Sequence, residues 1–317
     1  MIRTISKKYD LIAESDTNKI KLKPVSVLFS NLEYLQIVSS KSLCSFYIYD
    51  KIKSYILGII RFQIDDDTAT SLVNAPFGSI VLNTQVEFEI LDKFIRFFTE
   101  YLFDSGVSRI IINHYPWIYN PIQHDKIVSA YGLSGFNVGK VDISHYVQID
   151  SDSLISKLHR MEKRKLSKCK KEGFLFKEHH NKDLNFLFTF IKSFRIKRNI
   201  PLNIDLQIIE ALISKLPDHY KLFSLNSGND LIACTIAVKA SKDVLYNFLP
   251  AHNPKYDAYS PMVYLLEKIY EYAGKHQFKY LDLGISSINN KPQPDLIKFK
   301  ERMGGITASK FSFLKNL

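Results

Sequence analysis

Apolar residues form three strand-like runs, separated by polar clusters, in the second half of the chain. The runs lie within YKLFSLNSGNDLIACTIAVKASKDVLYNFLPAH, residues 220–252, and the clusters between them are NSGND and SKD. This pattern predicts an antiparallel three-stranded meander. The spacing then becomes helical over SPMVYLLEKIYEYAGK, residues 260–275, with Ser260 as the N-cap and Pro261 at the first helical position.

Further elements are predicted on both sides of this meander. Before it come a strand at FLFKEH (174–179) and helices at DLNFLFTFIKSFRIKR (183–198) and IDLQIIEALISKL (204–216). After it come a strand at KYLDLGI (279–285), a helix within DLIKFKERMGG (295–305) and a strand at ASKFSFL (308–314). The second half is therefore expected to be a mixed α/β domain.

The first half follows the same order of elements. A meander is predicted within residues 43–76, then a helix near 86–103, a strand at 108–114, a helix at 121–133 and a strand at 136–150. The residues of the two halves are not detectably similar, so the repeat lies in element order alone. We expect a first domain over residues 1–150 and a second over 151–317. The fold class is mixed α/β with a mixed sheet in each copy.

A basic segment joins the two predicted domains. SDSLISKLHRMEKRKLSKCKKEG, residues 151–173, is expected to form one long helix over about 152–172, between N-cap candidates and a terminal glycine. On a helical wheel its apolar residues gather on one side and most basic residues on the other. Lys163, Arg164 and Lys168 on that basic face are candidates for binding phosphates of a polyanion. The alternative is a solvated helix surface.

The overall charge agrees with an anionic partner. The formal net charge is +11 over 317 residues, although lysine richness alone accounts for part of it. Neither a disulfide framework nor a metal site is indicated, because the three cysteines are far apart and no Cys/His spacing is suitable. No run approaches 18 apolar residues and the first ten residues lack a signal-peptide core, so we expect a cytoplasmic protein.

One lysine is placed where a helix normally carries an apolar residue. In DLIKFKERMGG, Leu296, Phe299 and Met303 share one face, and Lys300 lies in the middle of that arc. An ammonium in a partly desolvated cleft can stabilise an oxyanion or a leaving hydroxyl during attack of an amine on a carbonyl. The alternative is a lysine whose stem covers apolar surface while its charge reaches water.

The order of elements in the second half resembles the acyltransferase fold called GNAT, and specific segments resemble its Fem-type branch. These segments are APFGSIVLN in the first half, and KLHRMEKRKLSKCKKEGF, YSPMVYLLEKIYEYA, YLDLGIS and IKFKERMGG in the second. Fem-type proteins carry two GNAT-like domains in tandem and include transferases that build peptidoglycan cross-bridges from aminoacyl-tRNA. The resemblance implies an acyltransferase that modifies an amine in a cleft between two domains, with the first copy shaping the acceptor site.

The resemblance also suggests site residues. Phe299 and Lys300 match a Phe-Lys pair that points its lysine into the reaction site. Arg198, with Arg195 close by, matches an arginine near substrate phosphates, and Tyr246 matches an aromatic residue directed at the substrate; a surface arginine and a core tyrosine are the alternatives. Candidates that complete the site are Asp282, as a proton acceptor or a ligand of loop amides, Ser260, in substrate binding, and more weakly His252.

The donor is left open by the turn before the helix at 260–275. Acetyl-CoA enzymes of this fold cradle the pyrophosphate on a Gly-rich turn, whereas HNPKYDAYSP, residues 252–261, contains no glycine. The donor is therefore acyl-CoA or aminoacyl-tRNA, with no tightly bound cofactor expected, and the acceptor is an amine such as a peptidoglycan precursor. A second hypothesis is a non-catalytic protein that binds RNA or another polyanion through the basic helix.

Overall fold

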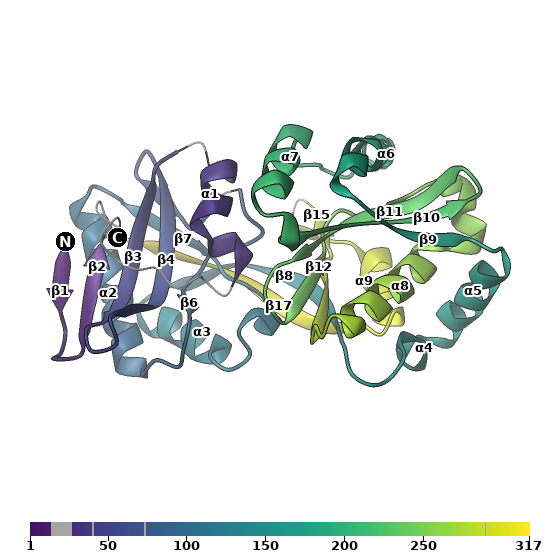
Figure 1. The fold of residues 1–317 in the computed structure, drawn as a ribbon. Coiled ribbons are helices and arrows are strands. Elements are labelled where there is room, and N and C mark those ends of the chain that lie inside the picture. Colours follow the sequence, from purple (N-terminus) through teal and green to yellow (C-terminus); the bar gives the residue numbers. More distant parts are fainter. Residues whose placement is uncertain (14–26, 40, 73, 289) are drawn as a thin grey trace. The chain divides into compact units, whose positions relative to one another are not determined.

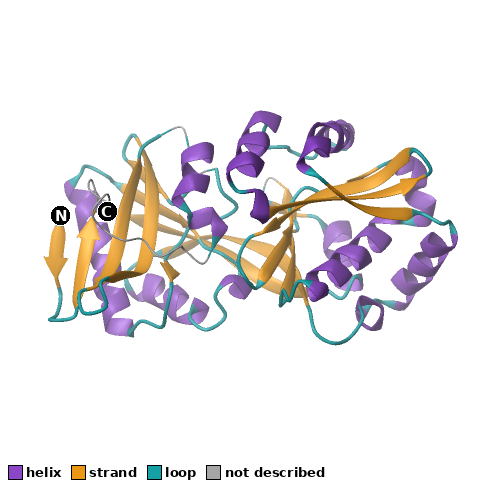
Figure 2. Cartoon of the chain, in the orientation of Figure 1, coloured by secondary structure: helices purple, strands orange, loops and turns teal. Residues whose placement is uncertain are grey.

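Two compact units make up the structure, a computed structural model that describes residues 1–13, 27–39, 41–72, 74–288 and 290–317 (Figures 1 and 2). The first unit contains residues 1–141 and 309–317, and the second contains 142–308. These limits differ from a division at residue 150, because strand pairing decides them. The last strand of the chain pairs with a strand of the first unit, and residues 144–148 pair with a strand of the second.

The first unit is built on a mixed sheet with the order β1-β2-β3-β4-β5-β7-β17. Only β5 and β7 in this order are paired in parallel, and β6 pairs with β4. Its strands are β1 (Ile2–Thr4), β2 (Tyr9–Ala13), β3 (Leu43–Asp50), β4 (Tyr55–Asp65), β5 (Thr68–Thr70), β6 (Val81–Leu82), β7 (Arg109–Asn113) and β17 (Ile306–Asn316). Its helices are α1 (Leu32–Val38), α2 (Phe88–Asp104) and α3 (His124–Leu133).

The core of the first unit lies under α2. Leu91, Phe94, Phe98 and Leu102, spaced three or four residues apart, are all buried on one face of this helix. Phe98 contacts the ring of Phe46 on β3 at 5.8 Å between centroids. The meander, helices and strands predicted between residues 43 and 150 are confirmed in type and order, whereas β1, β2, α1 and β6 were not predicted.

The second unit has the sheet order β8-β14-β12-β11-β10-β9, in which β12 and β14 are parallel, and β13 pairs with β11. Its strands are β8 (Asn137–Gln148), β9 (Leu175–His179), β10 (Tyr220–Ser227), β11 (Asp230–Lys239), β12 (Val244–Asn247), β13 (Ala251–His252) and β14 (Tyr280–Ile285), with β15 (Ser287–Ile288) and β16 (Lys291–Pro292) forming a separate pair. Its helices are α4 (Leu154–Lys157), α5 (Arg160–Lys171), α6 (Leu184–Lys197), α7 (Leu206–Lys215), α8 (Pro261–Lys275) and α9 (Pro294–Arg302), and the 3-10 helix η6 (Pro254–Tyr259) precedes α8.

Helices cover both faces of this second sheet, with α6 and α7 on one face and α8 on the other (Figure 1). Helix α8 buries Val263, Leu266, Ile269 and Ala273 along one stripe against the sheet. Ser260 occupies the predicted N-cap position, but its side chain makes no cap hydrogen bond and its φ of 53° is left-handed. No helix in the described part of the chain is long and apolar enough to span a membrane.

The basic segment after residue 150 is not one long helix, as the pattern predicts, but two. Helix α4 ends at Lys157 and α5 begins at Arg160, because Leu158 and His159 have extended backbone angles. The His159 side chain accepts a hydrogen bond from the amide of Met161 and so caps α5. The His159 amide donates to the carbonyl of Arg302 at 2.8 Å, which ties this break to the end of α9.

Candidate functional site

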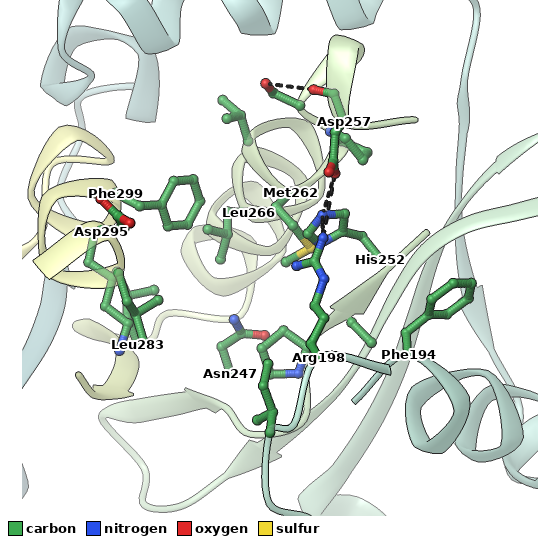
Figure 3. Close-up of a pocket in the computed structure, with 18 of the residues that line it drawn as sticks. Phe194, Arg198, Asn247, His252, Asp257, Met262, Leu266, Leu283, Asp295 and Phe299 are labelled. Atoms are coloured by element: carbon green, nitrogen blue, oxygen red, sulfur yellow. Dashed lines mark hydrogen bonds and ion pairs between the residues drawn. The ribbon is translucent and has the colours of Figure 1, made fainter. Parts of the chain in front are cut away.

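A pocket of about 490 Å³ lies in the second unit, and every residue that lines it belongs to that unit (Figure 3). Much of its wall is apolar, with Phe194, Met262, Leu266, Leu283 and Phe299 among the lining residues. Its polar lining residues are Lys165, Arg195, Arg198, Asn247, His252, Asp257, Ser260, Asp295 and Lys300. An apolar enclosure with a few polar groups is the usual character of a small-molecule site.

Lys300 is buried at the edge of this pocket, as the helical wheel of α9 predicts. Its side chain does not escape to water, because the residue is only 6% exposed. The Nζ atom donates hydrogen bonds to the carbonyl oxygens of Gly284 and Ile285, each at 2.8 Å. An ammonium has three N–H groups, so within the described structure one is left for a group in the pocket.

Burial lowers the pKa of Lys300 from 10.5 to about 8, and the nearby carboxylate of Asp282 acts in the opposite direction. Desolvation penalises the charged form, whereas a negative neighbour favours it. With this pKa the side chain is still mainly an ammonium at neutral pH, and it can release and regain a proton more readily than an exposed lysine. Both properties suit a group that stabilises charge and moves a proton in catalysis.

The two carbonyl groups that hold Lys300 come from a bulge in β14. The pairing of β14 with β8 shifts register between Asp282 and Gly284, and Gly284 has a left-handed φ of 72°. Asp282 Oδ1 accepts a hydrogen bond from the Gly284 amide at 2.7 Å. A Cβ at Gly284 would be 3.2 Å from Cε2 of Tyr246. The bulge therefore needs glycine, and Asp282 and Tyr246 surround it.

A buried histidine lies behind Lys300. His145 on β8 is fully buried, and its Nδ1 is 3.0 Å from the hydroxyl oxygen of Ser286. Burial, followed by the charge of Lys300, lowers the pKa of His145 to about 4. The imidazole is therefore neutral at physiological pH and adds no positive charge beside the lysine. Sequence reasoning did not select this residue, because nothing in the pattern of β8 distinguishes it.

Three charged or titratable side chains meet at another part of the pocket wall. Arg198, directly after α6, donates from Nη2 to Nε2 of His252 at 2.9 Å. The same His252 nitrogen is 2.8 Å from Oδ1 of Asp257, and Arg198 Nη2 is 3.6 Å from that oxygen. Figure 3 shows the three side chains as one connected group. Burial and then Arg198 lower the pKa of His252, whereas Asp257 raises it.

The glycine-free turn before α8 is the 3-10 helix η6, and it uses its own backbone amides. Pro254 and Pro261 have no N–H group. Among the amides that donate within the turn are those of Lys255 and Tyr256, both to Asn253, of Ser260, to the carbonyl of Asp257, and of Val263, to the carbonyl of Ser260. These groups are not available to a pyrophosphate in the way that a Gly-rich turn would offer them.

The structure brings together five of the candidates from sequence. Lys300, Phe299, Arg195, Arg198 and Ser260 all line the pocket. Arg195 donates from Nη2 to the carbonyl of Pro201 at 2.9 Å, and burial lowers the pKa of its guanidinium. Asp282 and Tyr246 are not lining residues. Asp282 accepts a hydrogen bond from the amide of Gly284 within the bulge of β14, and Tyr246 lies beside the same bulge.

The basic residues selected from sequence lie elsewhere, on α5. Lys163, Arg164 and Lys168 line a shallow hollow of about 360 Å³ together with Ser167 and Lys171. Lys168 also donates to the carbonyl of Ala258 at 3.0 Å, so its ammonium is partly engaged.

Several pocket residues were not found from sequence. Lys165, Asn247, Asp257 and Asp295 line the pocket, and His252 was only a weak candidate. Asp257 is in the turn that lacks glycine, so the unusual composition of that turn was the available signal. Asn247 accepts a hydrogen bond from the Thr235 hydroxyl at 2.7 Å through Oδ1.

A serine, a histidine and an aspartate are hydrogen bonded in series outside the pocket. His179 Nδ1 is 2.9 Å from Asp183 Oδ2, and its Nε2 is 2.7 Å from Ser224 Oγ. Ser224 is fully buried, and its hydroxyl oxygen also accepts a hydrogen bond from the side-chain Nδ2 of Asn226 at 2.6 Å. A hydroxyl without solvent access cannot attack a substrate, so this group joins β9 to β10 and does not form a hydrolase site.

Comparisons with known proteins agree with this geometry. Residues 159–291 match the family described as Acetyltransferase (GNAT) domain. No curated protein matches the chain in sequence. Among solved structures, FemX has 12% identity and a TM-score of 0.69, with 93% of each chain covered. The chain therefore has the GNAT fold, and its architecture is similar to that of FemX. Its sheet and tandem architecture are those of this fold.

Two further solved structures are similar to this chain in fold. L-PGS from Bacillus licheniformis is 12% identical, with a TM-score of 0.61 and coverage of 88% of this chain and 85% of that one. A tandem GNAT protein from the clavulanic acid biosynthesis pathway is 8% identical, with a TM-score of 0.50 and coverage of 87% and 83%. At these identities the likeness concerns the fold. The GNAT domain match supports an N-acyltransferase in general, and the pocket lies within the unit that contains it.

Proposed function

We propose that this protein transfers an acyl or aminoacyl group to an amine in the pocket that contains Lys300. The observation that carries the proposal is the lysine itself. It is buried, fixed by two backbone carbonyls, shifted to a pKa of about 8 and placed at the wall of a largely apolar pocket. A charge held in this way needs no reorganisation when an oxyanion develops.

In the proposed reaction the acceptor amine attacks the carbonyl carbon of an ester or thioester donor. A C–N bond forms and the carbonyl oxygen becomes an oxyanion, which the remaining N–H of Lys300 stabilises. The C–O or C–S bond of the donor then breaks. Lys300 gives a proton to the leaving oxygen or sulfur and regains one from the ammonium of the new adduct, so no proton is gained or lost.

Asp282 has a positioning role in this scheme. Its carboxylate accepts from the Gly284 amide, and it acts on Lys300 electrostatically by favouring the ammonium. Tyr246 packs against the same bulge. Arg198, His252 and Asn247 lie on the pocket wall, where they are able to contact a bound substrate.

The donor is an acyl-CoA or an aminoacyl-tRNA. The GNAT fold supports the first, whereas the amides used within η6 favour a donor that is not held by a pyrophosphate turn. The resemblance to Fem-type transferases makes a peptidoglycan precursor the acceptor to test first among amines.

The test is a comparison of Lys300→Met with Lys298→Met, which removes an exposed lysine on the same helix. Transfer would be followed with labelled acetyl-CoA and with charged tRNA as donors, and folding by the thermal unfolding midpoint. We expect K300M to lose about 10²–10³-fold in rate, the effect typical of losing one oxyanion donor, and K298M to be unaffected. A folded K300M protein with the wild-type rate would exclude this role of Lys300.

A second candidate function is polyanion binding by the face of α5 described above. Arg164 and Lys171 are exposed there, and no ion pair to either is found among the described residues. Phosphates of a nucleic acid would interact with such a face without a role for Lys300. The two functions therefore respond differently to substitutions in α5 and in α9.

A further inference from the structure

In the Arg198–His252–Asp257 group, the carboxylate of Asp257 lies beside a guanidinium and an imidazole. Asp257 and Asp295 are the carboxylates among the described residues that line the pocket. Asp257 is paired with both His252 and Arg198, whereas no hydrogen bond or ion pair of the Asp295 side chain is found in the described part of the chain. The acidic group at Arg198 is thus supplied by the protein itself.

The hydrogen bonds of this group cannot all be satisfied together. Arg198 can only donate, so its contact requires a lone pair on His252 Nε2. Asp257 can only accept when ionised, so its contact requires a proton on the same nitrogen. Nε2 has either the lone pair or the proton. One of the two contacts is therefore always incompletely formed, so Arg198 and Asp257 compete for the same nitrogen of His252.

Asp257 is also free to leave this position at low cost. Its side chain is 57% exposed, so a displaced carboxylate would be hydrated. Its backbone carbonyl, not its side chain, accepts the hydrogen bond from Ser260 that shapes the turn. An exposed ion pair contributes little to stability. Rotation of the side chain would expose Arg198 and His252 to the pocket without disturbing η6.

We propose that Asp257 occupies the place of a substrate phosphate and must be displaced before a phosphorylated donor binds at Arg198 and His252. The inference rests on the proposed function in taking this pocket as the donor site. Several amides of the preceding turn, including those of Lys255, Tyr256 and Ser260, are already engaged, so in this proposal the side chains of Arg198 and His252 supply the anion contacts. Asp257 then acts as a specificity residue, since only a group with more negative charge or better geometry than a carboxylate displaces it.

The test measures binding of inorganic pyrophosphate by titration calorimetry to wild type, Asp257→Asn and Asp295→Asn. We expect D257N to bind about threefold or more tightly than wild type, the size of effect for an exposed charge contact. D295N removes the same charge from the same pocket and is expected to bind as wild type does. Arg198→Gln in the D257N background should abolish the gain. Thermal unfolding midpoints would confirm that each variant is folded.

Equal affinities of D257N and wild type, or equal gains in D257N and D295N, would refute the displacement. So would undetectable pyrophosphate binding by both wild type and D257N. Repeating the titration with CoA identifies the source of the phosphate. If D257N binds CoA more tightly than wild type does, the phosphate that displaces Asp257 belongs to CoA. If only pyrophosphate is bound more tightly, that phosphate belongs to a donor other than CoA.

The readout is binding, so it is separate from the test of the proposed function. If K300M retains full transfer while D257N shows the gain, the reaction scheme fails and the anion site stands. If transfer depends on Lys300 but D257N binds as wild type does, the scheme stands and the displacement fails.

Discussion

Replacement of Gly284 by alanine tests whether the bulge in β14 forms the support for Lys300. Its φ of 72° places alanine in the left-handed region, which costs a residue with a Cβ about 1–2 kcal/mol. The added Cβ would also lie 3.2 Å from Tyr246 Cε2 and 3.3 Å from its hydroxyl oxygen. Crowding of this kind costs about 1–3 kcal/mol more. We therefore expect G284A to lose about 2–5 kcal/mol of unfolding free energy.

Gly228→Ala is the matched control. Gly228 has a left-handed φ of 56°, but nothing lies within 4 Å of its added Cβ. It therefore carries the conformational cost without the crowding. For a unit of this size, a loss of about 1 kcal/mol of unfolding free energy lowers the unfolding midpoint by about 2–4 °C. The midpoint of G284A should therefore fall at least twice as far as that of G228A. Because Gly284 also supplies a carbonyl to Lys300, G284A should reduce transfer, and G228A should not.

Thermal or urea unfolding of the two variants would measure the difference, and a double-mutant cycle with Tyr246→Ala would assign it. Alanine at 284 should cost less when the Tyr246 ring is absent. Equal losses for G284A and G228A, or a cost at 284 that is unchanged in the Y246A background, would refute the idea that Tyr246 and the bulge are packed as described.

Two other predictions concern pH and charge. The rate of transfer should decline as pH rises past about 8, because Lys300 loses its proton there. A reaction that depended on an exposed lysine would decline only near pH 10.5. Because the pKa of Lys300 is lowered, the unfolded chain binds more protons than the folded one between about pH 8 and 10.5. The unfolding free energy of the wild type, relative to that of K300M, should therefore rise with pH across that window. A fall across the window would contradict this prediction. Charge reversal of Lys163 and Arg164 should weaken binding of a polyanion and reduce the slope of log affinity against log salt by about 1–2, whereas an unchanged slope would exclude the basic face of α5 as a binding site.

The sequence by itself determined most of the elements and their order, although not β1, β2 and α1 or the division of residues 152–172 into α4 and α5. Period-two runs and helical spacing are local properties, so both meanders, α2, α8 and the strand at 280–285 were predicted from the pattern. Burial of Lys300 also followed from sequence, because its position in the arc of Leu296, Phe299 and Met303 is a property of one helix. The arginines near residue 198 and the unusual turn before α8 were visible as motifs, and the structure places both at the pocket.

The tertiary structure alone decided what those elements contact. The break at residues 158–159 depends on a cap and on a hydrogen bond to Arg302, more than 140 positions away in the chain. The assignment of the last strand to the first unit depends on its pairing with β7, which no local pattern records. The support for Lys300 needs the register shift in β14, and the meeting of Arg198, His252 and Asp257 needs α6, β13 and η6 to be packed together. Hydrophobic spacing specifies which face of an element is buried, whereas the partner of each polar group is fixed only when separate elements pack and leave one geometry that satisfies it.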